Sequence, residues 1–379
     1  MMEKHRLIMS PEALHRISIR GFRSIASIED LALRPLNVLI GANGAGKSNF
    51  IGAFSFLCAI REGRLQDYVT VAGGAERVLH FGSKTTGVMS FDLSFEEPSV
   101  NYVLKLSPTD DDGLFPSTEI ALVSNPNFST PITIPFQPRP KRREAGISAD
   151  QPDAVAKSLA ECVGNWRVYH VHDTSSTSLM RKTAKLHDNR FLRSDGSNLA
   201  AFLFFLFEKH PDSYRLIQKT VQQVAPFFDD FRLEPLLLRP DSIKLEWRHK
   251  DSDQYFDAAA LSDGTLRFMA LATLFLQPKI LHPQIILVDE PELGLHPFAI
   301  TLLASLIQEA SVETQVIVST QSSLLLDHLK PEDVLVAERQ GGSTQIRRLD
   351  SERLKEWLDE YSLGELWEKN ELGGRPGSE

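Results

Sequence analysis

The chain has 379 residues, of which 42% are hydrophobic and 24% are charged. This is the composition of an ordinary globular protein and excludes a disordered, collagen-like or coiled-coil chain, and the length suggests two or three domains or one large core with an insertion. The net charge of −9 argues against a nucleic-acid binder that uses its whole surface, but not against a local basic groove. With only 2 cysteines, far apart in sequence, the chain cannot build a disulfide framework or a cysteine-based zinc finger by itself.

The sequence contains no segment that resembles a membrane span. Its longest apolar run covers residues 199–207, which is far shorter than the about 20 residues needed to cross a bilayer. The N-terminus also lacks the apolar stretch of a secretory signal. We therefore expect a cytoplasmic protein that has no membrane partner.

The first expected elements surround a glycine cluster. Apolar residues alternate over 14–20 as in a strand, and residues 36–40 indicate a short buried strand that runs into the glycines. Apolar residues then recur at helical spacing over 48–60, which gives the order strand, glycine loop, helix. Alternation over 88–95 and again over 102–106 predicts an antiparallel pair of strands.

The middle of the chain has a looser pattern. Residues 107–155 are rich in proline and contain a run of aspartates, a composition typical of loops and edge strands, and we place the boundary of an insertion there. Helices are expected over 197–208 and 214–224, and a strand over 243–247. The expected domains are an N-terminal part of the core over 1–106, an insertion or helical lid lobe over 107–255, and a C-terminal part of the core over 256–379.

The C-terminal part alternates helices with buried strands. A helix over 265–276 precedes residues 285–288, a continuously apolar strand of the kind buried on both faces of a parallel sheet. A helix over 301–310 and strands over 315–319 and 333–338 follow. The pattern predicts an α/β fold with a mainly parallel core sheet, an antiparallel β subdomain and a partly helical insertion.

The segment Gly41-Ala-Asn-Gly-Ala-Gly-Lys-Ser48 matches the phosphate-loop pattern G-x-x-x-x-G-K-[ST] at every fixed position. The backbone N–H groups of such a loop surround phosphate oxygens, and the following helix directs its positive dipole end at the same anion. We expect Lys47 to reach the β- and γ-phosphates of a nucleotide and Ser48 to bind Mg²⁺. The expected nucleotide-binding residues of this segment are Gly41, Ala42, Asn43, Gly44, Ala45, Gly46, Lys47, Ser48 and Asn49.

Two carboxylates follow the apolar strand over 285–288. A carboxylate at the tip of a buried parallel strand lies at the sheet edge where such folds bind ligands. Asp289 can therefore hold Mg²⁺ through water, while Glu290 faces the γ-phosphate and polarises the attacking water. Acidic residues commonly end strands, so this pair indicates a catalytic site only in combination with the phosphate loop upstream.

Ser262 and Gly264, within Leu261-Ser-Asp-Gly-Thr265, precede the next helix and form a second anion-binding surface at its N-terminus. One chain does not need two phosphate sites for one nucleotide. With these residues the sequence resembles ATP-binding-cassette-type P-loop ATPases of the branch that contains RecF, the structural-maintenance-of-chromosomes (SMC) proteins and the overcoming-lysogenisation-defect (OLD) ATPases. Within that branch it is most similar to compact bacterial ATPases without a long coiled coil. The resemblance is densest over 15–60 and 257–330.

The resemblance implies a head-to-tail homodimer that forms with ATP, in which the Leu-Ser-x-Gly segment of one subunit closes over the ATP held by the other. It also implies that residues 291–297 cross the interface and that Arg23 approaches the nucleotide phosphates. Where many relatives place a switch histidine, this chain has Gln321, which can donate a hydrogen bond but carries no charge, so slow turnover is expected. For the glutamine loop of these families the sequence offers Gln66, a residue that an exposed surface position explains better.

Three other features leave alternatives open. His170 and His172 would present two imidazoles on one face of a strand for a metal, but ordinary histidines explain them more simply because no third ligand stands at a fixed spacing. The basic residues over 139–143 and 181–193 belong either to solvated loops or to a nucleic-acid groove. About 40 residues follow the last expected strand, fewer than the about 50 of a domain, so we do not expect the metal-binding nuclease domain of the OLD proteins here.

Two hypotheses for function follow. The first is an ATP-hydrolysing switch that closes around two Mg-ATP molecules and moves the insertion, which contacts DNA, RNA or an effector protein in DNA repair or phage defence. The alternative is a nucleotide-bound sensor or scaffold with negligible turnover that assembles a toxin or nuclease encoded nearby. A phosphoryl-transferring kinase is disfavoured, because a monomeric kinase has no use for residues 261–265.

Overall fold

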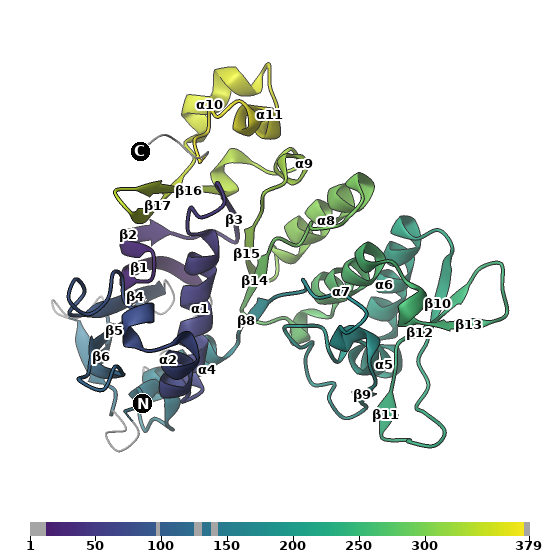
Figure 1. The fold of residues 1–379 in the computed structure, drawn as a ribbon, viewed down its shortest axis with the longest axis horizontal. Helices are drawn as coiled ribbons and strands as arrows, with labels where there is room; N and C mark the ends of the chain where they lie inside the picture. Colours follow the sequence, from purple (N-terminus) through teal and green to yellow (C-terminus); the bar gives the residue numbers. More distant parts are fainter. Residues whose placement is uncertain (1–12, 96–98, 125–130, 138–142, 375–379) are drawn as a thin grey trace, which may run out of the picture. The chain divides into compact units, whose positions relative to one another are not determined.

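The computed structural model describes residues 13–95, 99–124, 131–137 and 143–374. The chain forms two compact units. Figure 1 labels their helices and strands along the ribbon. Unit 1 consists of Met1–Arg167, Pro331–Tyr361 and Leu366–Glu379, and unit 2 consists of Val168–Lys330 and Ser362–Glu365. The phosphate loop lies in unit 1, whereas the carboxylates after residue 288 and the Leu-Ser-Asp-Gly segment lie in unit 2.

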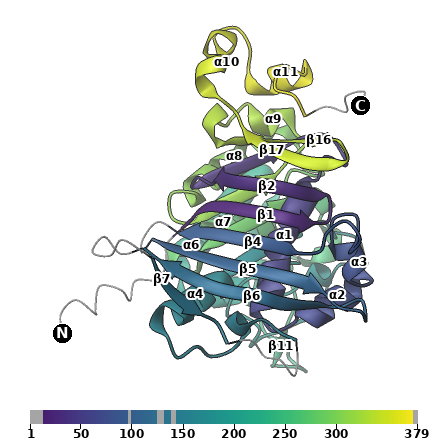
Figure 2. The same ribbon diagram turned by 90° about the vertical axis from the view of Figure 1, so that its left-hand side faces the viewer.

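Unit 1 contains an antiparallel sheet with the strand order β2-β1-β4-β5-β6-β7. Figure 2 shows these strands side by side. The pair expected over 88–95 and 102–106 is confirmed, since β4 and β5 are antiparallel neighbours. The strand bounds are Leu14–Phe22 (β1), Ile25–Ala32 (β2), Met89–Phe95 (β4), Val100–Pro108 (β5), Leu114–Val123 (β6) and Ile132–Pro135 (β7).

Within residues 107–155 we expected loops and edge strands, but the structure contains β6, a ten-residue strand that lies between β5 and β7. The alternation of apolar and polar residues that indicates a strand is interrupted by Glu119, an acidic residue at an inward, buried position. The Glu119 carboxylate accepts hydrogen bonds from the Tyr102 hydroxyl (2.8 Å) and from the N–H groups of Gly146 (2.6 Å) and Ile147 (2.8 Å). A buried carboxylate is tolerated where its oxygens have such donors.

Helix α1 (Lys47–Arg61) packs its apolar face on this sheet. The ring of Phe56 in α1 lies 5.5 Å from that of Phe22 and 5.8 Å from that of Phe91, measured between centroids. Such aromatic pairs add to the free energy gained by burial and fix α1 against the sheet. The neighbouring helices are α2 (Leu65–Ala72), α3 (Ala75–Val78) and α4 (Ala154–Gly164).

Unit 1 also holds the strand that leads into the phosphate loop. Strand β3 (Leu36–Ile40) is buried at every residue and pairs in parallel with β16 (Val334–Gln340). Strand β17 (Ser343–Arg348) pairs antiparallel with β16 and also contacts β2. The buried strands expected over 36–40 and 333–338 are therefore confirmed.

Unit 2 contains the parallel pair β14 (Ile285–Asp289) and β15 (Gln315–Ser319), which confirms the parallel core strands expected there. Strand β8 (Trp166–Tyr169), in which the boundary between the units falls, neighbours β14. Helix α7 (Asp263–Leu276) packs against α8 (Pro297–Ala310), and the short helix α9 (Ser323–Leu326) follows β15.

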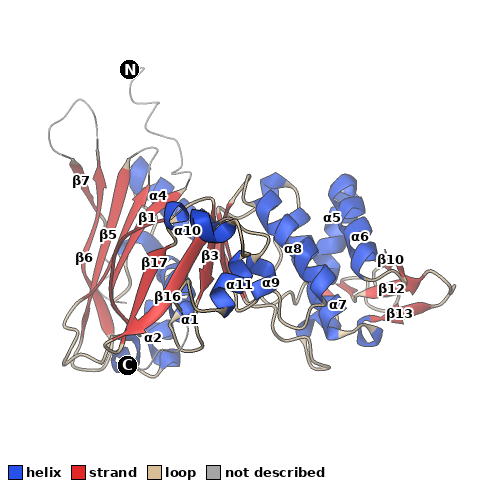
Figure 3. Cartoon of the chain, turned by 90° about the horizontal axis from the view of Figure 1, so that it is seen from above, coloured by secondary structure: helices blue, strands red, loops and turns tan. Residues whose placement is uncertain are grey.

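The rest of unit 2 is built on helices α5 (Leu199–Lys209) and α6 (Pro211–Val224), and α6 contacts both α5 and α7. Figure 3 labels these three helices. The strand expected over 243–247 is split, because Ile243 pairs with Ala184 while Trp247 pairs with Phe231. Among the described residues, no helix is both long and apolar enough to span a bilayer. The remaining strands of unit 2 are β9 (Ala184–Lys185), β10 (Phe228–Arg232), β11 (Ser242–Ile243), β12 (Glu246–His249) and β13 (Tyr255–Asp257). Helix α10 (Ser351–Leu358) belongs to unit 1, and the boundary between the units falls within α11 (Leu363–Glu368).

Candidate functional site

The phosphate loop joins β3 to α1 and takes its shape from glycine. Gly41, Gly44 and Gly46 have φ angles of 148°, 82° and 102°, a region that residues with a side chain rarely adopt. Lys47 folds back over the loop, and its Nζ donates hydrogen bonds to the carbonyl oxygens of Gly41 (2.7 Å) and Ala42 (3.1 Å). The loop thus holds an ammonium group at the N-terminus of α1, where the helix dipole and free N–H groups also attract an anion.

Two residues far away in sequence support this loop. A Cβ atom on Gly46 would lie 2.0 Å from Thr344 Oγ1 in β17 and 2.9 Å from Ser24 Oγ, so only glycine fits there. The buried Thr344 hydroxyl donates to the Ala45 carbonyl oxygen (3.0 Å), and it lies 2.8 Å from the Ser24 hydroxyl. Nothing local in the sequence marks Ser24 or Thr344, because their role depends on how β17 meets the turn after β1.

The remaining residues of the loop differ in exposure. Asn43 and Ser48 are exposed, whereas Asn49 is half-buried and its amide donates to Ser24 Oγ (2.7 Å). The Ser48 hydroxyl therefore remains accessible to a metal ion in the first turn of α1, as its predicted role requires. Asn49 instead contributes to the support of the loop.

Arg23 lies in the turn between β1 and β2 with a φ of 49°. Its Nη2 donates to the Tyr68 hydroxyl (3.0 Å), and its guanidinium carbon lies 5.4 Å from the centroid of the Phe22 ring and 5.9 Å from that of Tyr68. Burial raises the pKa of Tyr68, which keeps the phenol neutral beside this cation. These contacts hold a half-buried guanidinium within unit 1.

The predicted carboxylates lie at the end of β14 in unit 2. Asp289 stands opposite Ser319 of β15, and the Ser319 hydroxyl donates to Asp289 Oδ1. Glu290 follows with a φ of 43°, a strained conformation for a residue that is not glycine, while its N–H donates to the Ser319 carbonyl oxygen (2.9 Å). The Gln321 side-chain amide donates to Glu290 Oε1, so the structure brings Glu290 and Gln321 together.

Glu292 is a third acidic residue of this edge, which the sequence did not single out within residues 291–297. Its Oε1 accepts from the Thr320 hydroxyl (2.6 Å) and from the Gln321 N–H (2.9 Å), while its Oε2 is buried without a partner among the described residues. Burial raises the pKa of the Glu292 carboxyl. Glu292 therefore ties the loop after β14 to the turn that carries Gln321.

The Leu-Ser-Asp-Gly segment begins α7 in unit 2. Ser262 is exposed and caps the helix, with its Oγ accepting from the Thr265 N–H (3.1 Å). A Cβ atom on Gly264 would lie 2.5 Å from the carbonyl oxygen of Gly294, so glycine is required for residues 291–297 to approach α7. The two segments that the resemblance places at a dimer interface therefore contact each other within one chain.

A buried arginine fixes the turn before α7. Arg181 comes from the basic stretch over 181–193, yet its side chain is only 7% exposed. Its guanidinium binds Asp263 Oδ1 (2.7 Å) and donates to the carbonyl oxygens of Leu261 (3.2 Å) and Ala258. Arg181 thus orders the Leu-Ser-Asp-Gly turn and is not a surface cation.

The other predicted basic residues have mixed surroundings. In the stretch over 181–193, Arg193 pairs with Asp188 (2.6 Å), whereas Lys182, Lys185 and Arg190 are exposed. Of the stretch over 139–143, residues 139–142 lie outside the described part of the chain, and Arg143 pairs with Asp111 (2.7 Å).

The Gln66 amide donates to the carbonyl oxygens of Leu114 (2.8 Å) and Arg143 (3.0 Å), so it connects α2 to neighbouring segments of unit 1.

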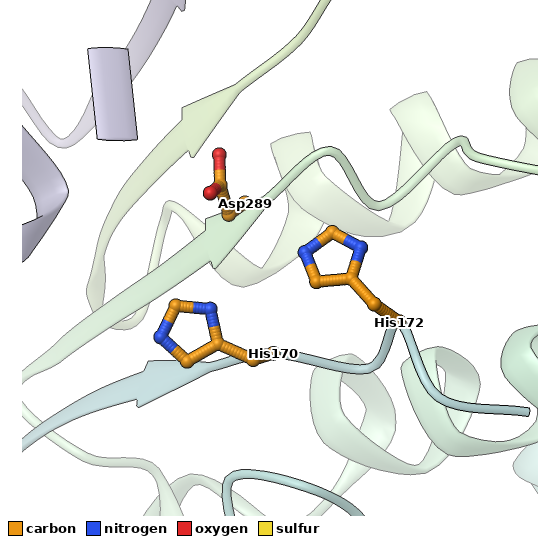
Figure 4. Close-up of side chains that lie close together, drawn as sticks. All are labelled: His170, His172 and Asp289. Carbon is orange, nitrogen blue, oxygen red and sulfur yellow. The ribbon is translucent and has the colours of Figure 1, made fainter. Parts of the chain in front are cut away.

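His170 and His172 follow β8, and both lie beside Asp289 (Figure 4). One potential ligand atom of each of the three side chains falls within 4.8 Å of the others. Burial lowers the pKa of His170, and the Asp289 carboxylate partly opposes that shift. The third potential ligand, which the local sequence lacks, thus comes from the neighbouring strand β14.

Residues 36–327, more than half of the chain, match the family described as "AAA domain, putative AbiEii toxin, Type IV TA system". The chain is 36% identical over 85 residues to the DNA replication and repair protein RecF of Renibacterium salmoninarum, a match that covers 22% of this chain and 21% of RecF. It is 24% identical over 385 residues to the Old nuclease of Escherichia phage P2, which covers 90% of this chain and 62% of that protein. The chain thus spans less than two thirds of either curated relative.

Solved structures with a similar fold include the SMC head bound to the C-winged helix domain of ScpA. That chain superposes with a TM-score of 0.62 at 16% identity, over 90% of this chain and 99% of the SMC head. An SMC head with an extended coiled coil, bound to the C-terminal domain of ScpA derived from Pyrococcus furiosus, gives a TM-score of 0.57 at 14% identity, over 92% and 99% of the two chains. These similarities confirm the predicted α/β P-loop fold.

Proposed function

The chain belongs to the matched AAA-domain family and is similar to RecF, the Old nuclease and SMC heads. We propose that it is an ATP-hydrolysing switch that closes head to tail as a homodimer around two Mg-ATP molecules. In this proposal residues 41–49 bind the phosphates, with Lys47 on the β- and γ-phosphates and Arg23 near them. The protein acts in the cytoplasm, and closure of the dimer is its signal to a partner.

The observation that carries this proposal is the arrangement at the end of β14, where Gln321 holds Glu290 directly after Asp289. Glu290 is the base that takes the proton of the attacking water, and its strained backbone keeps the carboxylate at the tip of the strand. Gln321 positions Glu290 and donates a hydrogen bond to the γ-phosphate. Since Gln321 cannot carry positive charge, it stabilises the developing negative charge less than a protonated histidine would, and turnover is slow.

The residues present also fit Mg²⁺. Ser48 offers an exposed hydroxyl, and Asp289 keeps one carboxylate oxygen beyond the one that accepts from Ser319. Hydroxyl and carboxylate oxygens are the ligands that Mg²⁺ uses beside nucleotide phosphates and water. When bound, the ion neutralises charge on the phosphates during transfer to water. Ser48 and Asp289 are therefore the proposed metal-binding residues.

The proposed dimer interface is supported by exposed groups around α7. Ser262 lies exposed at the N-terminus of this 14-residue helix, where N–H groups and the helix dipole attract phosphate. Leu293 and Phe298 are 50% and 52% exposed, and large apolar side chains of this kind are common at protein interfaces. Ser262 and Gly264 of one copy are proposed to close over the nucleotide of the other.

DNA is the first proposed partner, because the RecF relative is named for DNA replication and repair and the Old relative for nuclease activity. The exposed cations Lys182, Lys185 and Arg190 are the proposed contacts to its phosphates. RNA or an effector protein encoded nearby is the alternative partner. The family description, which names a toxin, supports a role in phage defence beside one in DNA repair.

The variant Glu290→Gln tests the proposed hydrolysis. It removes the base but keeps the shape of the side chain, so we expect ATP binding to persist while the steady-state rate of phosphate release falls at least about 100-fold. Glu309→Gln, at an exposed position of α8, is the matched control and should hydrolyse ATP as the parent protein does. Undiminished hydrolysis in Glu290→Gln would refute the role assigned to Glu290.

The second candidate function is a nucleotide-bound scaffold with negligible turnover that assembles a separate toxin or nuclease. It is favoured by the neutral Gln321 in contact with Glu290. Phosphate release measured with and without DNA separates the two functions. DNA-stimulated turnover supports the switch, whereas tight ATP binding without turnover under both conditions supports the scaffold.

A further inference from the structure

His170, His172 and Asp289 form a cluster that neither family membership nor the proposed hydrolysis explains. The two histidines flank the buried Val171 directly after β8, while Asp289 ends the neighbouring strand β14 (Figure 4). One ligand atom from each side chain falls within 4.8 Å of the other two. Three side chains able to bind a metal therefore converge from two separate segments of unit 2.

The backbone that carries the histidines is held on both sides. The His170 N–H donates to the carbonyl oxygen of Ser194 (2.9 Å). The guanidinium of Arg267, a residue only 5% exposed, donates to the carbonyl oxygens of Val171 (2.8 Å) and His172 (2.8 Å). A buried guanidinium costs free energy unless its hydrogen bonds form, so Arg267 should hold both carbonyl groups in place. The segment that carries the two imidazoles therefore has little freedom to move.

Asp289 is held as well. The Ser319 hydroxyl donates to Asp289 Oδ1, which orients the carboxylate and leaves Oδ2 as a ligand atom. Hydrogen bonds of this kind to a ligating carboxylate position it and tune its affinity for the metal. His170 is exposed, which gives an ion a path to the cluster.

We propose that His170, His172 and Asp289 bind one divalent transition-metal ion, such as Zn²⁺ or Co²⁺, with at least one coordination position left open. Imidazole nitrogens favour first-row transition metals, and two imidazoles with one carboxylate make a three-ligand site of the catalytic kind. Ligands bound at about 2.0–2.2 Å to a tetrahedral ion lie about 3.4 Å apart, so movements on the order of 1 Å close the site. Mg²⁺ prefers oxygen ligands and competes poorly here.

The inference goes beyond the proposed function, with which it shares only Asp289. An ion bound by the two histidines engages the same carboxylate that is proposed to serve the Mg²⁺ of ATP. The two ions therefore compete for one side chain, and the histidine pair offers a way for a transition metal to act on the nucleotide site.

The test uses the full chain without nucleotide, after treatment with a chelator, so it does not depend on ATP hydrolysis. Titration with Co²⁺, followed by its visible absorption bands, is expected to show one ion bound per chain, with Zn²⁺ displacing Co²⁺ and millimolar Mg²⁺ failing to do so. The double variant His170→Ala/His172→Ala should bind Co²⁺ at least about 10-fold more weakly. His187→Ala, an exposed histidine of the same unit, is the matched control and should bind Co²⁺ as the parent chain does.

Two results would overturn the inference. One is Co²⁺ affinity that the double variant leaves unchanged, and the other is displacement of Co²⁺ by Mg²⁺ as readily as by Zn²⁺. Thermal unfolding followed by circular dichroism verifies that the variants fold. The pair His170→Gln/His172→Gln, which retains polar side chains of similar length, gives the same comparison if the alanine variant is unstable.

Discussion

The phosphate loop in unit 1 and the carboxylate edge of β14 in unit 2 obtain their geometry by different means. The loop is one continuous stretch, over 41–49, whose shape comes from glycine backbone and from a lysine that binds its own loop carbonyl groups. The edge is assembled from side chains of several segments, with Ser319 holding Asp289 and Gln321 holding Glu290. Backbone changes should therefore damage the loop most, whereas the edge should respond most to changes in charge or hydrogen bonding.

The two regions also carry charge of opposite sign. The loop offers an ammonium group and N–H donors, which attract phosphate without help from a metal. The edge offers carboxylates, which repel phosphate unless a cation lies between them. The loop is thus expected to decide the affinity for nucleotide, and the edge the rate at which bound nucleotide reacts.

The largest expected effect concerns the charge of the loop. Lys47→Ala removes an ammonium group that is buried in the loop and proposed to bind two phosphates. We expect the dissociation constant for ATP to rise at least about 100-fold, measured by fluorescence or calorimetric titration. Lys182→Ala, an exposed lysine of unit 2, should leave that constant near the parent value. If the Lys47→Ala variant and the parent bound ATP with equal affinity, the loop would not be the nucleotide-binding site.

The backbone of the loop can be tested with a matched pair of glycines. Gly46→Ala meets both a disfavoured φ and the Thr344 hydroxyl, and should lower the free energy of unfolding by about 2–4 kcal/mol. Gly44→Ala has the same disfavoured sign of φ, but among the described residues nothing lies within 4 Å of the added Cβ, so about 1 kcal/mol is expected. Denaturant unfolding of both variants separates backbone strain from packing, and equal losses would show that Thr344 does not constrain the loop.

The support of the Leu-Ser-Asp-Gly turn gives a smaller effect. Arg181→Ala removes the guanidinium that donates to the carbonyl oxygens of Ala258 and Leu261, and should lower the free energy of unfolding by about 1–3 kcal/mol. Because the turn then loses its shape, we also expect phosphate release to slow by about 10-fold or more. The control is Arg190→Ala, an exposed position of the same basic stretch, and phosphate release is measured without DNA because Arg190 is a proposed DNA contact. If both variants behave alike, the buried contacts of Arg181 have no role in turnover.

The smallest effect concerns pH and Glu292. Burial raises the pKa of this carboxyl in the folded protein, so the folded state binds its proton more tightly than the unfolded state does. The wild type therefore loses stability as the pH rises from about 4 through the raised pKa, and the full cost remains above it. Glu292→Gln removes this charge, so its melting temperature relative to the wild type should be higher at pH 8 than at pH 5. Glu309→Gln should show no such difference between the two pH values.

The sequence predicts a region well when the contacts that shape it join residues close together in the chain. The loop was predicted because its pattern is continuous and lies between a buried strand and a helix. Ser24 and Thr344, which lie 320 positions apart, were missed because their contact exists only once β17 meets the turn after β1. Strand β6 was missed as part of the sheet because Glu119 occupies an inward position that the pattern assigns to an apolar residue.

The edge shows the same limit more strongly. Asp289 and Glu290 could be predicted because they end a strand of four apolar residues. The third ligand beside His170 and His172 could not, since it comes from a neighbouring strand and no spacing within the sequence encodes that contact. Arg181 was grouped with surface cations because its charge is visible in the sequence and its burial is not.

The central claim is that two copies of the chain enclose the nucleotide between the loop of one copy and the Ser262 turn of the other. Sedimentation velocity of the Glu290→Gln variant with and without Mg-ATP tests it most directly, because this variant should keep its ATP. The account predicts a shift from monomer to dimer on adding Mg-ATP, and loss of that shift when Ser262→Arg is added. A variant that is saturated with ATP and still sediments as a monomer would contradict it.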